Sequence, residues 1–369
     1  LLPFGSPIII LFFGGFVLAV AFRKYEIDKF IATRLLKLFG NRPYSIMLGF
    51  MLTTAILSMW MSDTATTALM LAMLLPLIQK IDQSDRFRTA LILCIPFSAL
   101  IGGMCTPVGT PPNAIAIGIL ADYGIHITFF SWMKMAVPLG VILLGVASFV
   151  LYFTFPPNAS CIALKIDPHP IKGKKAKSVV AISVATILMW LTSGWHEIPP
   201  AIIALLSAAI FACFSILDRE DFKSIKWDIL ILMWGGLALG KGIELSGLAR
   251  WIVNQPIFQQ QGFLLIAEFC FLAIVLSTFM SNTATANLLI PIVMLIPGEN
   301  SIMLAATIAL VCSLAMILPI STPPNALVFS TDMLKSKDMI ITGLIISIVS
   351  VVIILFGFKF VITRAFGLE

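Results

Sequence analysis

Two short polar stretches decide how this sequence is interpreted. The first is "LSMWMSDTATTALM" at Leu57–Met70, and the second is "LSTFMSNTATANLL" at Leu276–Leu289. Seven of their first ten positions are identical, although 219 residues separate them. Both interrupt strongly apolar sequence with small hydroxyl residues, and Asp63 in the first corresponds to Asn282 in the second. We call them the first and second polar motifs.

The sequence around the motifs has the composition of a membrane protein. The chain has 369 residues, of which 59% are hydrophobic and 11% are charged. A soluble domain of this size cannot bury so much apolar sequence. The net charge is +6, but Lys and Arg lie in short clusters between apolar runs, which is typical of cytoplasmic loops. We therefore predict an all-α polytopic protein of the lipid bilayer, with no nucleic-acid partner.

Apolar runs of about 20 residues are long enough to cross a bilayer. Such runs predict crossings at 7–22, 89–121, 132–156, 178–194, 199–217, 229–246, 301–331 and 339–361. The two longest runs each contain the sequence "TPPNA", at Thr110–Ala114 and Thr322–Ala326. A pair of prolines removes two backbone donors and ends a helix. Each long run is therefore predicted to be a broken helix, with an unwound stretch between two helical parts.

Two further apolar regions are predicted to form re-entrant hairpins. Residues 45–80 and 263–297 each contain two arms of about 15 residues around one polar motif. Fifteen helical residues rise about 22 Å, which is less than the hydrocarbon core of about 30 Å. The tip of each hairpin would lie near the middle of the membrane, where irregular backbone is tolerated if it lines a cavity.

Landmarks recur in the same order along the two halves of the chain. "FGGFVLA" at Phe13–Ala19 parallels "WGGLALG" at Trp234–Gly240, and a polar motif and a "TPPN" break follow each. The offsets of 221, 219 and 212 residues indicate an internal duplication. We predict a first repeat at 1–156, a cytoplasmic linker at 157–177 and a second repeat at 178–369. The second repeat has two helices ahead of its Gly pair that the first lacks, so two or three N-terminal helices are expected to be missing from this chain.

Basic residues predict the orientation of the chain. With the linker in the cytoplasm, the inside loops are 23–42, 80–88, 165–177, 218–228 and 335–338. These loops hold 19 of the 24 Lys and Arg residues, in agreement with the positive-inside rule. His196 and Glu197 are then expected outside. The two hairpins enter from opposite sides, and the repeats have opposite topology, which is typical of inverted-repeat secondary transporters. The Gly pairs Gly14–Gly15 and Gly235–Gly236 are interpreted as close-packing points.

The hairpin tips have groups suited to an anion and to Na⁺. The N-terminus of each second arm presents free N–H groups and a helix dipole to an anion. Ser62, Thr64, Ser281 and Thr283 add hydroxyl groups, while carbonyls at the ends of the first arms suit Na⁺. The simpler alternative is that these side chains only cap and pack helices, and that the breaks are proline kinks without a ligand. No Walker A, catalytic triad or HExxH motif is present, which argues against an enzyme, ATP drive or an organic cofactor.

The paired motifs resemble the Ser-Asn-Thr signatures of the divalent anion:sodium symporter family. "MSDTAT" and "MSNTAT" are each followed by a "TPPN" break, and the resemblance covers nearly the whole chain from Phe13 onward. It implies a homodimer in which a transport domain moves against a static scaffold, as in an elevator. It also implies Na⁺-coupled transport of small divalent anions: C4-dicarboxylates such as succinate, citrate, or sulfate in some branches.

The resemblance also implies positions for the ions and the substrate. Na⁺ would bind at two or more sites, one near Ser58, Ser62, Asp63 and Gly109, and another near Ser277, Met280, Asn282 and Ser321. The substrate carboxylates would meet Asp63, Thr64, Thr110, Asn282, Thr283 and Pro323. The sequence departs from the family at Asp63, where Asn is usual. A carboxylate there would repel a dianion unless a cation or a proton neutralises it. Alternatively, Asp63 merely caps the second arm.

Other classes of function stay open from the sequence. The nearest are a Na⁺-independent dicarboxylate exchanger and a carrier of sulfate or another inorganic oxyanion with the same fold. An arsenite or Na⁺/H⁺ carrier, a channel and a membrane-embedded enzyme are more distant. The second motif offers an amide and hydroxyls without Lys or Arg at its tip, which favours an oxyanion. The expected location is the bacterial inner (plasma) membrane, with many crossings.

Overall fold

The computed structural model describes residues 5–158, 161–162, 167, 169–255, 262–296 and 300–357, and every regular element within them is helical. The prediction of an all-α protein is confirmed for these residues. The described residues cover, wholly or in part, the predicted first repeat (1–156), the linker (157–177), the hairpin at 263–297, the broken helix at 301–331 and the crossing at 339–361. The remaining positions of these predictions lie outside the described residues.

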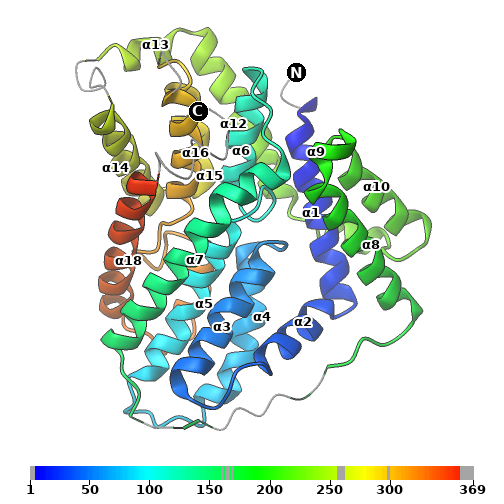
Figure 1. The fold of residues 1–369 in the computed structure, drawn as a ribbon, viewed down its shortest axis with the longest axis vertical. Helices are drawn as coiled ribbons and strands as arrows, with labels where there is room; N and C mark the ends of the chain where they lie inside the picture. Colours follow the sequence, from blue (N-terminus) through cyan, green and yellow to red (C-terminus); the bar gives the residue numbers. More distant parts are fainter. Residues whose placement is uncertain are drawn as a thin grey trace.

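The helices follow the predicted apolar runs and add several short elements (Figure 1). The first half of the chain contains α1 (Pro7–Lys24), α2 (Ile27–Leu36), α3 (Pro43–Ser58), α4 (Asp63–Ile78), α5 (Phe87–Gly103), α6 (Pro111–Asp122) and α7 (Phe129–Thr154). The second half contains α8 (Lys174–Leu191), α9 (Ser193–His196), α10 (Pro200–Cys213), α11 (Arg219–Lys223), α12 (Trp227–Leu245), α13 (Leu248–Val253), α14 (Phe263–Phe279), α15 (Asn282–Val293), α16 (Asn300–Cys312), α17 (Pro323–Phe329) and α18 (Ser336–Gly357). The short helices α2, α9, α11 and α13 were not predicted.

Among the described helices, α1, α7 and α18 are long and apolar enough to cross a membrane, by length and composition. They correspond to the predicted crossings at 7–22, 132–156 and 339–361. The crossing predicted at 199–217 is too long, because α10 ends at Cys213. Ser215 has a positive φ of 48°, and the N–H groups of Ile216 and Leu217 turn back to the carbonyl of Phe211. The 14 residues of α10 rise only about 21 Å.

Each polar motif lies between two short apolar helices that pack against each other. α3 ends and α4 begins around the first motif, and α14 and α15 stand in the same relation to the second. The first pair occupies the lower half of the molecule and the second pair the upper half (Figure 1). Both broken-helix predictions coincide with interruptions, since α5 and α6 flank one "TPPN" break and α16 and α17 flank the other.

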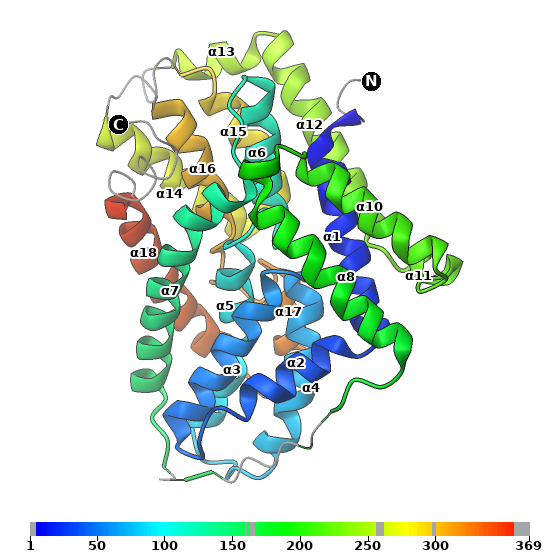
Figure 2. The ribbon, with the colours of Figure 1, turned by 45° about the vertical axis from the view of Figure 1, so that its right-hand side comes forward.

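The two halves of the chain interlock around these interruptions. The second helix of each motif packs against the helix that follows the other half's break: α4 contacts α17, and α15 contacts α6. α1 packs mainly against α10, beside α8, and these three helices form one flank of the molecule (Figure 2). Contacts between elements far apart in sequence therefore bring the motif of one half next to the break of the other.

The Gly pairs only partly behave as predicted. A Cβ added to Gly14 would lie 2.4 Å from Cβ of Ala204, and one added to Gly236 would overlap the side chain of Asn287. These two glycines allow α1 to approach α10, and α12 to approach α15. The interpretation is wrong for Gly235, where an added Cβ would meet nothing within 4 Å.

We expect Gly14→Ala to destabilise the protein by about 1–3 kcal/mol, because the new methyl group meets the backbone of α10 and cannot be relieved by a side-chain rotation. Gly235→Ala is the matched control, because the same methyl group enters open space and improves helix propensity by about 1 kcal/mol. Thermal unfolding of the purified variants in detergent measures both. Equal melting temperatures would show that Gly14 is not a tight contact.

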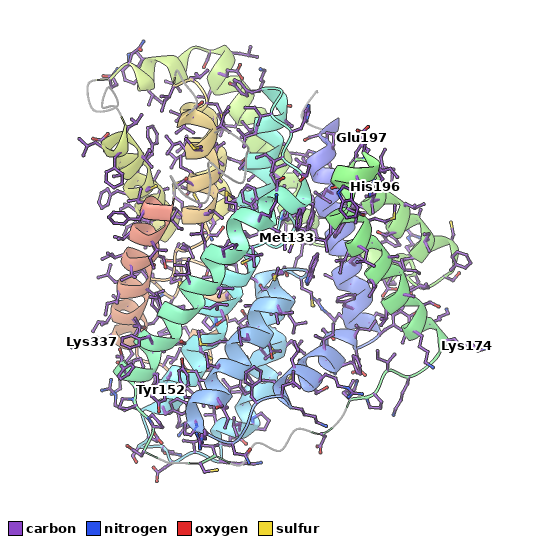
Figure 3. The ribbon with its side chains drawn as sticks, viewed as in Figure 1. Met133, Tyr152, Lys174, His196, Glu197 and Lys337 are labelled. Atoms are coloured by element: carbon purple, nitrogen blue, oxygen red, sulfur yellow. The ribbon has the colours of Figure 1, made fainter. Side chains whose placement is uncertain are left out.

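The predicted inside and outside residues lie at different levels of the molecule. Lys174 lies at the lower end of α8, and His196 and Glu197 lie near the opposite end of the same helical hairpin (Figure 3). Lys337, in another predicted inside loop, lies in the lower half with Lys174. Lys174 and Lys337 are thus separated along the long axis from His196 and Glu197. The side of the membrane on which each group lies stays a prediction.

Single-cysteine labelling tests this orientation. The exposed Cys161 and Cys213 are first replaced by Ser, since they would react with the reagent themselves. In intact cells, an impermeant thiol reagent should then label His196→Cys, and it should label Lys174→Cys only after permeabilisation. Strong labelling of position 174 from outside would overturn the orientation.

Candidate ion and substrate site

The first polar motif is closed by a hydrogen bond between its serine and its aspartate. The buried Ser58, at the end of α3, donates from Oγ to Oδ1 of Asp63 at 2.7 Å. Asp63 is the first residue of α4, so this bond spans the irregular tip between the two helices. Asp63 forms no ion pair with Lys, Arg or His within the described part of the chain. No basic side chain therefore neutralises the carboxyl group of Asp63 within the described part of the chain.

Asp63 does not cap α4, so that alternative from the sequence is wrong. Ser62 is the N-cap: its backbone is extended, with φ −67° and ψ 142°, and its Oγ accepts a hydrogen bond from the N–H of Ala65 at 3.4 Å. The second motif has the same arrangement, because Ser281 caps α15 by accepting from Ala284 at 3.1 Å. The Asx residue after each cap is thereby free to turn toward the end of the preceding helix.

The break between α5 and α6 packs directly against the first tip. Thr106 donates from Oγ1 to the carbonyl of Met59 at 2.5 Å, and its Oγ1 accepts from the N–H of Gly109 at 3.1 Å. A Cβ added to Gly103 would lie 2.2 Å from Oδ1 of Asp63, so only a glycine allows the carboxylate to sit there. A Cβ on Gly109 would in turn lie 2.3 Å from the carbonyl oxygen of Gly103. The structure thus brings Ser58, Asp63 and Gly109 into one cluster around Gly103.

The second polar motif repeats this geometry. Ser277 Oγ lies 2.7 Å from Oδ1 of Asn282 and 2.8 Å from the carbonyl oxygen of Cys312, the last residue of α16. A hydroxyl has one proton and cannot donate fully to both oxygens. Three oxygens, of which one is the hydroxyl oxygen of the buried Ser277, therefore lie close together, and a hard cation favours such a donor set.

The break between α16 and α17 completes the second cluster. Ser321 donates from Oγ to the carbonyl of Thr278 at 2.8 Å and accepts from the N–H of Leu318 at 3.2 Å. In both motifs, a hydroxyl group of the break donates to a carbonyl at the C-terminal end of the motif's first helix. Thr106 does so at the end of α3, and Ser321 does so at the end of α14. Of the predicted residues, the structure brings Ser277, Asn282 and Ser321 together.

The remaining predicted residues differ in how they are placed. Thr110 is 2% exposed and begins α6 without a side-chain capping bond, so its hydroxyl is not used by the helix. Thr283 is also buried, whereas Thr64 is half-buried. Met280 and Pro323 are exposed, and no described side-chain hydrogen bond joins either to the two clusters. Any role of Met280 would use its backbone, which is extended at φ −114° and ψ 173°.

Two asparagines that were not among the predicted site residues hold the breaks in shape. Asn113 donates from Nδ2 to the carbonyls of Gly103, Met104 and Thr106, at 3.2, 3.1 and 2.7 Å. Asn325, its counterpart 212 residues later, donates to the carbonyl of Leu318 at 3.0 Å. Their signal in the sequence is the fixed Asn after each Pro pair in "TPPN", because an unwound stretch frees carbonyls that need donors.

The described residues contain no group of three His, Cys, Asp or Glu side chains that could hold a metal ion. The oxygens of the two clusters come instead from hydroxyls, carbonyls, one carboxylate and one amide. Oxygen donors of this kind suit a weakly bound alkali cation.

We expect Asn113→Ala to destabilise the protein more than Asn325→Ala. Asn113 directs two N–H protons at three carbonyls, and the carbonyl of Gly103 has no other donor within the described part of the chain. The carbonyl of Leu318, by contrast, keeps the N–H of Ser321 when Asn325 is removed. A buried carbonyl left without a donor costs about 1–3 kcal/mol. Thermal unfolding in detergent compares the two variants on one scale. A larger loss for Asn325→Ala would contradict this account of the breaks.

Comparison with known proteins places the chain among transporters. The family description "Citrate transporter" (CitMHS) matches residues 1–301 and 194–368. The chain is 30% identical over 407 residues to the sodium-dependent dicarboxylate transporter SdcS of Staphylococcus aureus (strain USA300), which covers 99% of this chain and 78% of that protein. It is 34% identical over 386 residues to an uncharacterized transporter of Haemophilus influenzae, which covers 96% of this chain and 81% of that one.

A solved structure supports the fold alone. The YdaH transporter of Alcanivorax borkumensis, described as having an unusual topology, superposes with a TM-score of 0.64. The match covers 98% of this chain and 86% of that one at 15% identity. The full-length matches, with the apolar helices, point to an integral membrane transporter of dicarboxylate or citrate type and not to an enzyme. The chain therefore belongs to the divalent anion:sodium symporter family, as its paired motifs predicted.

Proposed function

We propose that the protein is a secondary transporter that carries a C4-dicarboxylate or citrate together with Na⁺. The observation that carries this proposal is the duplicated tip: the Ser58–Asp63 and Ser277–Asn282 contacts have the same five-residue spacing and the same length of 2.7 Å. If these side chains only capped helices, nothing would require two tips of the same geometry, each packed against a "TPPN" break. The Staphylococcus aureus relative is named a sodium-dependent dicarboxylate transporter, which supports the same substrate and ion.

Each cluster supplies the oxygens of one Na⁺ site in this proposal. The first would use Ser58, Ser62, Asp63 and the backbone of Gly109, and the second would use Ser277, Asn282, Ser321 and the backbone of Met280. Ser58, Ser277 and Ser321 are buried, so an ion beside them loses most of its water and depends on these oxygens. The proximity of the oxygens around Ser277 supports the second site most directly.

The substrate carboxylates would lie between the two tips. Helices α4, α6, α15 and α17 all begin at a motif or a break, and their N-terminal N–H groups favour anions. Thr64, Thr110, Asn282, Thr283, Pro323 and Asp63 would then line the substrate. A substrate with two separated carboxyl groups can contact both tips at once, which a substrate with a single small acid group cannot.

The wider architecture belongs to the same proposal. We infer an inverted repeat in which α3–α4 and α14–α15 are re-entrant hairpins that enter from opposite sides of a bacterial plasma membrane. The opposite placement of the two helix pairs and the matched breaks support this inference (Figure 1). Movement of these elements past α1, α8 and α10, within a homodimer, would give an elevator mechanism.

Uptake into proteoliposomes tests the function. Labelled succinate, citrate and sulfate are offered with an inward Na⁺ gradient or with K⁺ in its place. We expect succinate or citrate to accumulate only with Na⁺. Exchange against internal dicarboxylate without any effect of Na⁺ would make the protein an exchanger, and accumulation of sulfate alone would overturn the proposed substrate.

Asn282→Ala should lower the apparent affinity for the transported anion about ten- to hundredfold, because a lost hydrogen bond to a charged group costs about 1.5–3 kcal/mol. Asn287→Ala is a matched control on the same helix, since Asn287 is buried and its amide has no hydrogen-bond partner within the described part of the chain. The measurement is the concentration dependence of uptake. Normal uptake by Asn282→Ala would return the second motif to a packing role.

Asp63→Asn should change the Na⁺ dependence of uptake while leaving the fold intact, because Asn282 shows that the same tip geometry accepts an amide. Asp82→Asn, in the exposed loop after α4, removes the same charge away from the tips and serves as the control. Uptake measured against Na⁺ concentration and pH separates the possible roles. If only the pH profile flattens, a proton and not a cation neutralises Asp63. Unchanged profiles would exclude any coupling role.

A further inference from the structure

Helix α2 lies across the end of α1 and differs from the apolar helices around it. Glu26, between the two helices, has a left-handed backbone with φ 55°, which turns the chain sharply. One face of α2 is buried through Ile27, Ala32 and Leu36, at 0–2% exposure. The opposite face is exposed and basic. In Figures 1 and 2, α2 lies low in the molecule, beneath α1 and beside α3.

A cavity of about 180 Å³ lies between α2 and the chain that leads to α8. Its lining consists of Phe30, Thr33, Arg34, Lys37, His169 and Pro170. Three of these six residues can carry positive charge, and none is a carboxylate. A cavity with this lining attracts an anion and has no group that repels one.

The two strongest cations of the cavity are not neutralised within the described part of the chain. Arg34 and Lys37 form no ion pair there, whereas Lys29 on the same helix binds Oε1 of Glu26 at 2.6 Å. The imidazole of His169 lies 2.9 Å from Oε2 of the same glutamate. The hydrogen bond from Lys29, followed by that of His169, holds the pKa of Glu26 below its usual value. Both carboxylate oxygens of Glu26 are thus already paired.

The cavity has an apolar side that a free anion would not require. The guanidinium of Arg34 lies 5.6 Å from the centre of the Phe30 ring, which holds it over the apolar wall. Leu38 follows Lys37 and is 78% exposed. A basic helix with exposed apolar side chains beside its charges is typical of the membrane interface. The predicted orientation places this face at the cytoplasmic leaflet, which carries anionic lipids.

We propose that this cavity binds the phosphate of an anionic phospholipid headgroup, with Arg34 and Lys37 as its ligands and His169 as the opposite wall. The shared chemistry is a phosphate group, and the exposed Leu38 favours a lipid as its source over free phosphate. The site lies outside both polar motifs and does not depend on the proposed transport function. A lipid bound there would link α2 to the linker that precedes α8.

Native mass spectrometry of the purified protein tests the lipid, by titration with phosphatidylglycerol and with neutral phosphatidylcholine. The Arg34→Gln/Lys37→Gln variant should bind phosphatidylglycerol about thirtyfold more weakly, since each basic residue near an anionic surface contributes about fivefold (about 1 kcal/mol). The control Lys223→Gln/Lys241→Gln removes the same charge from two ion-paired lysines outside the cavity. Size-exclusion profiles establish that both variants are folded.

A second experiment measures the melting temperature of the same proteins in detergent, with and without inorganic phosphate. Selective loss of phosphatidylglycerol by the cavity variant, with no phosphate effect, supports the lipid site. A phosphate-induced rise in melting temperature that only the cavity variant loses supports the anion site with free phosphate as its ligand. Equal losses in the cavity variant and the control, or no binding of either probe, would overturn the proposal.

Discussion

The constraint on which the structure depends is the satisfaction of backbone polar groups where helices stop inside apolar surroundings. Four interruptions occur: two motif tips and two breaks. At each one, a small polar side chain bonds the freed backbone or closes the tip, as Thr106 does for Met59 and Ser321 does for Thr278. Because an unpaired buried group costs several kcal/mol in such an environment, these positions admit few other residues.

The same solution creates the candidate site. Side chains that satisfy an unwound backbone bring hydroxyl and carbonyl oxygens close together, and these atoms are also the ligands of a small cation. Ser277 shows the double use most clearly, because it contacts both the amide of Asn282 and the last carbonyl of α16. Helix N-termini beside these oxygens add the complementary preference for an anion. The candidate ion and substrate site thus lies at places that are otherwise structurally costly.

Much of this was predictable because it is local in the sequence. The paired motifs and the "TPPN" breaks located the interruptions, since proline and small polar residues act on the backbone around them. The contact of Thr106 with Met59 spans 47 residues and depends on how α5 packs, which no pattern shows. Asp63 was given an alternative role as a cap because Asp and Ser cap equally well, and only the backbone shows that Ser62 takes that place. Helix α2 was missed because ten residues with a mixed face give a weak signal.

The difference between Asp63 and Asn282 places an ionisable group at one tip without changing the shape of the tip. Both accept from a serine five residues earlier at 2.7 Å. With an amide at each tip, two bound Na⁺ would balance a dianion. With Asp63 ionised, two Na⁺ leave one positive charge against the two negative charges of the substrate. Neutrality then requires a third cation, a proton, or a substrate that carries one negative charge. A single carboxylate oxygen in place of an amide nitrogen therefore bears on the stoichiometry of transport more than on the fold.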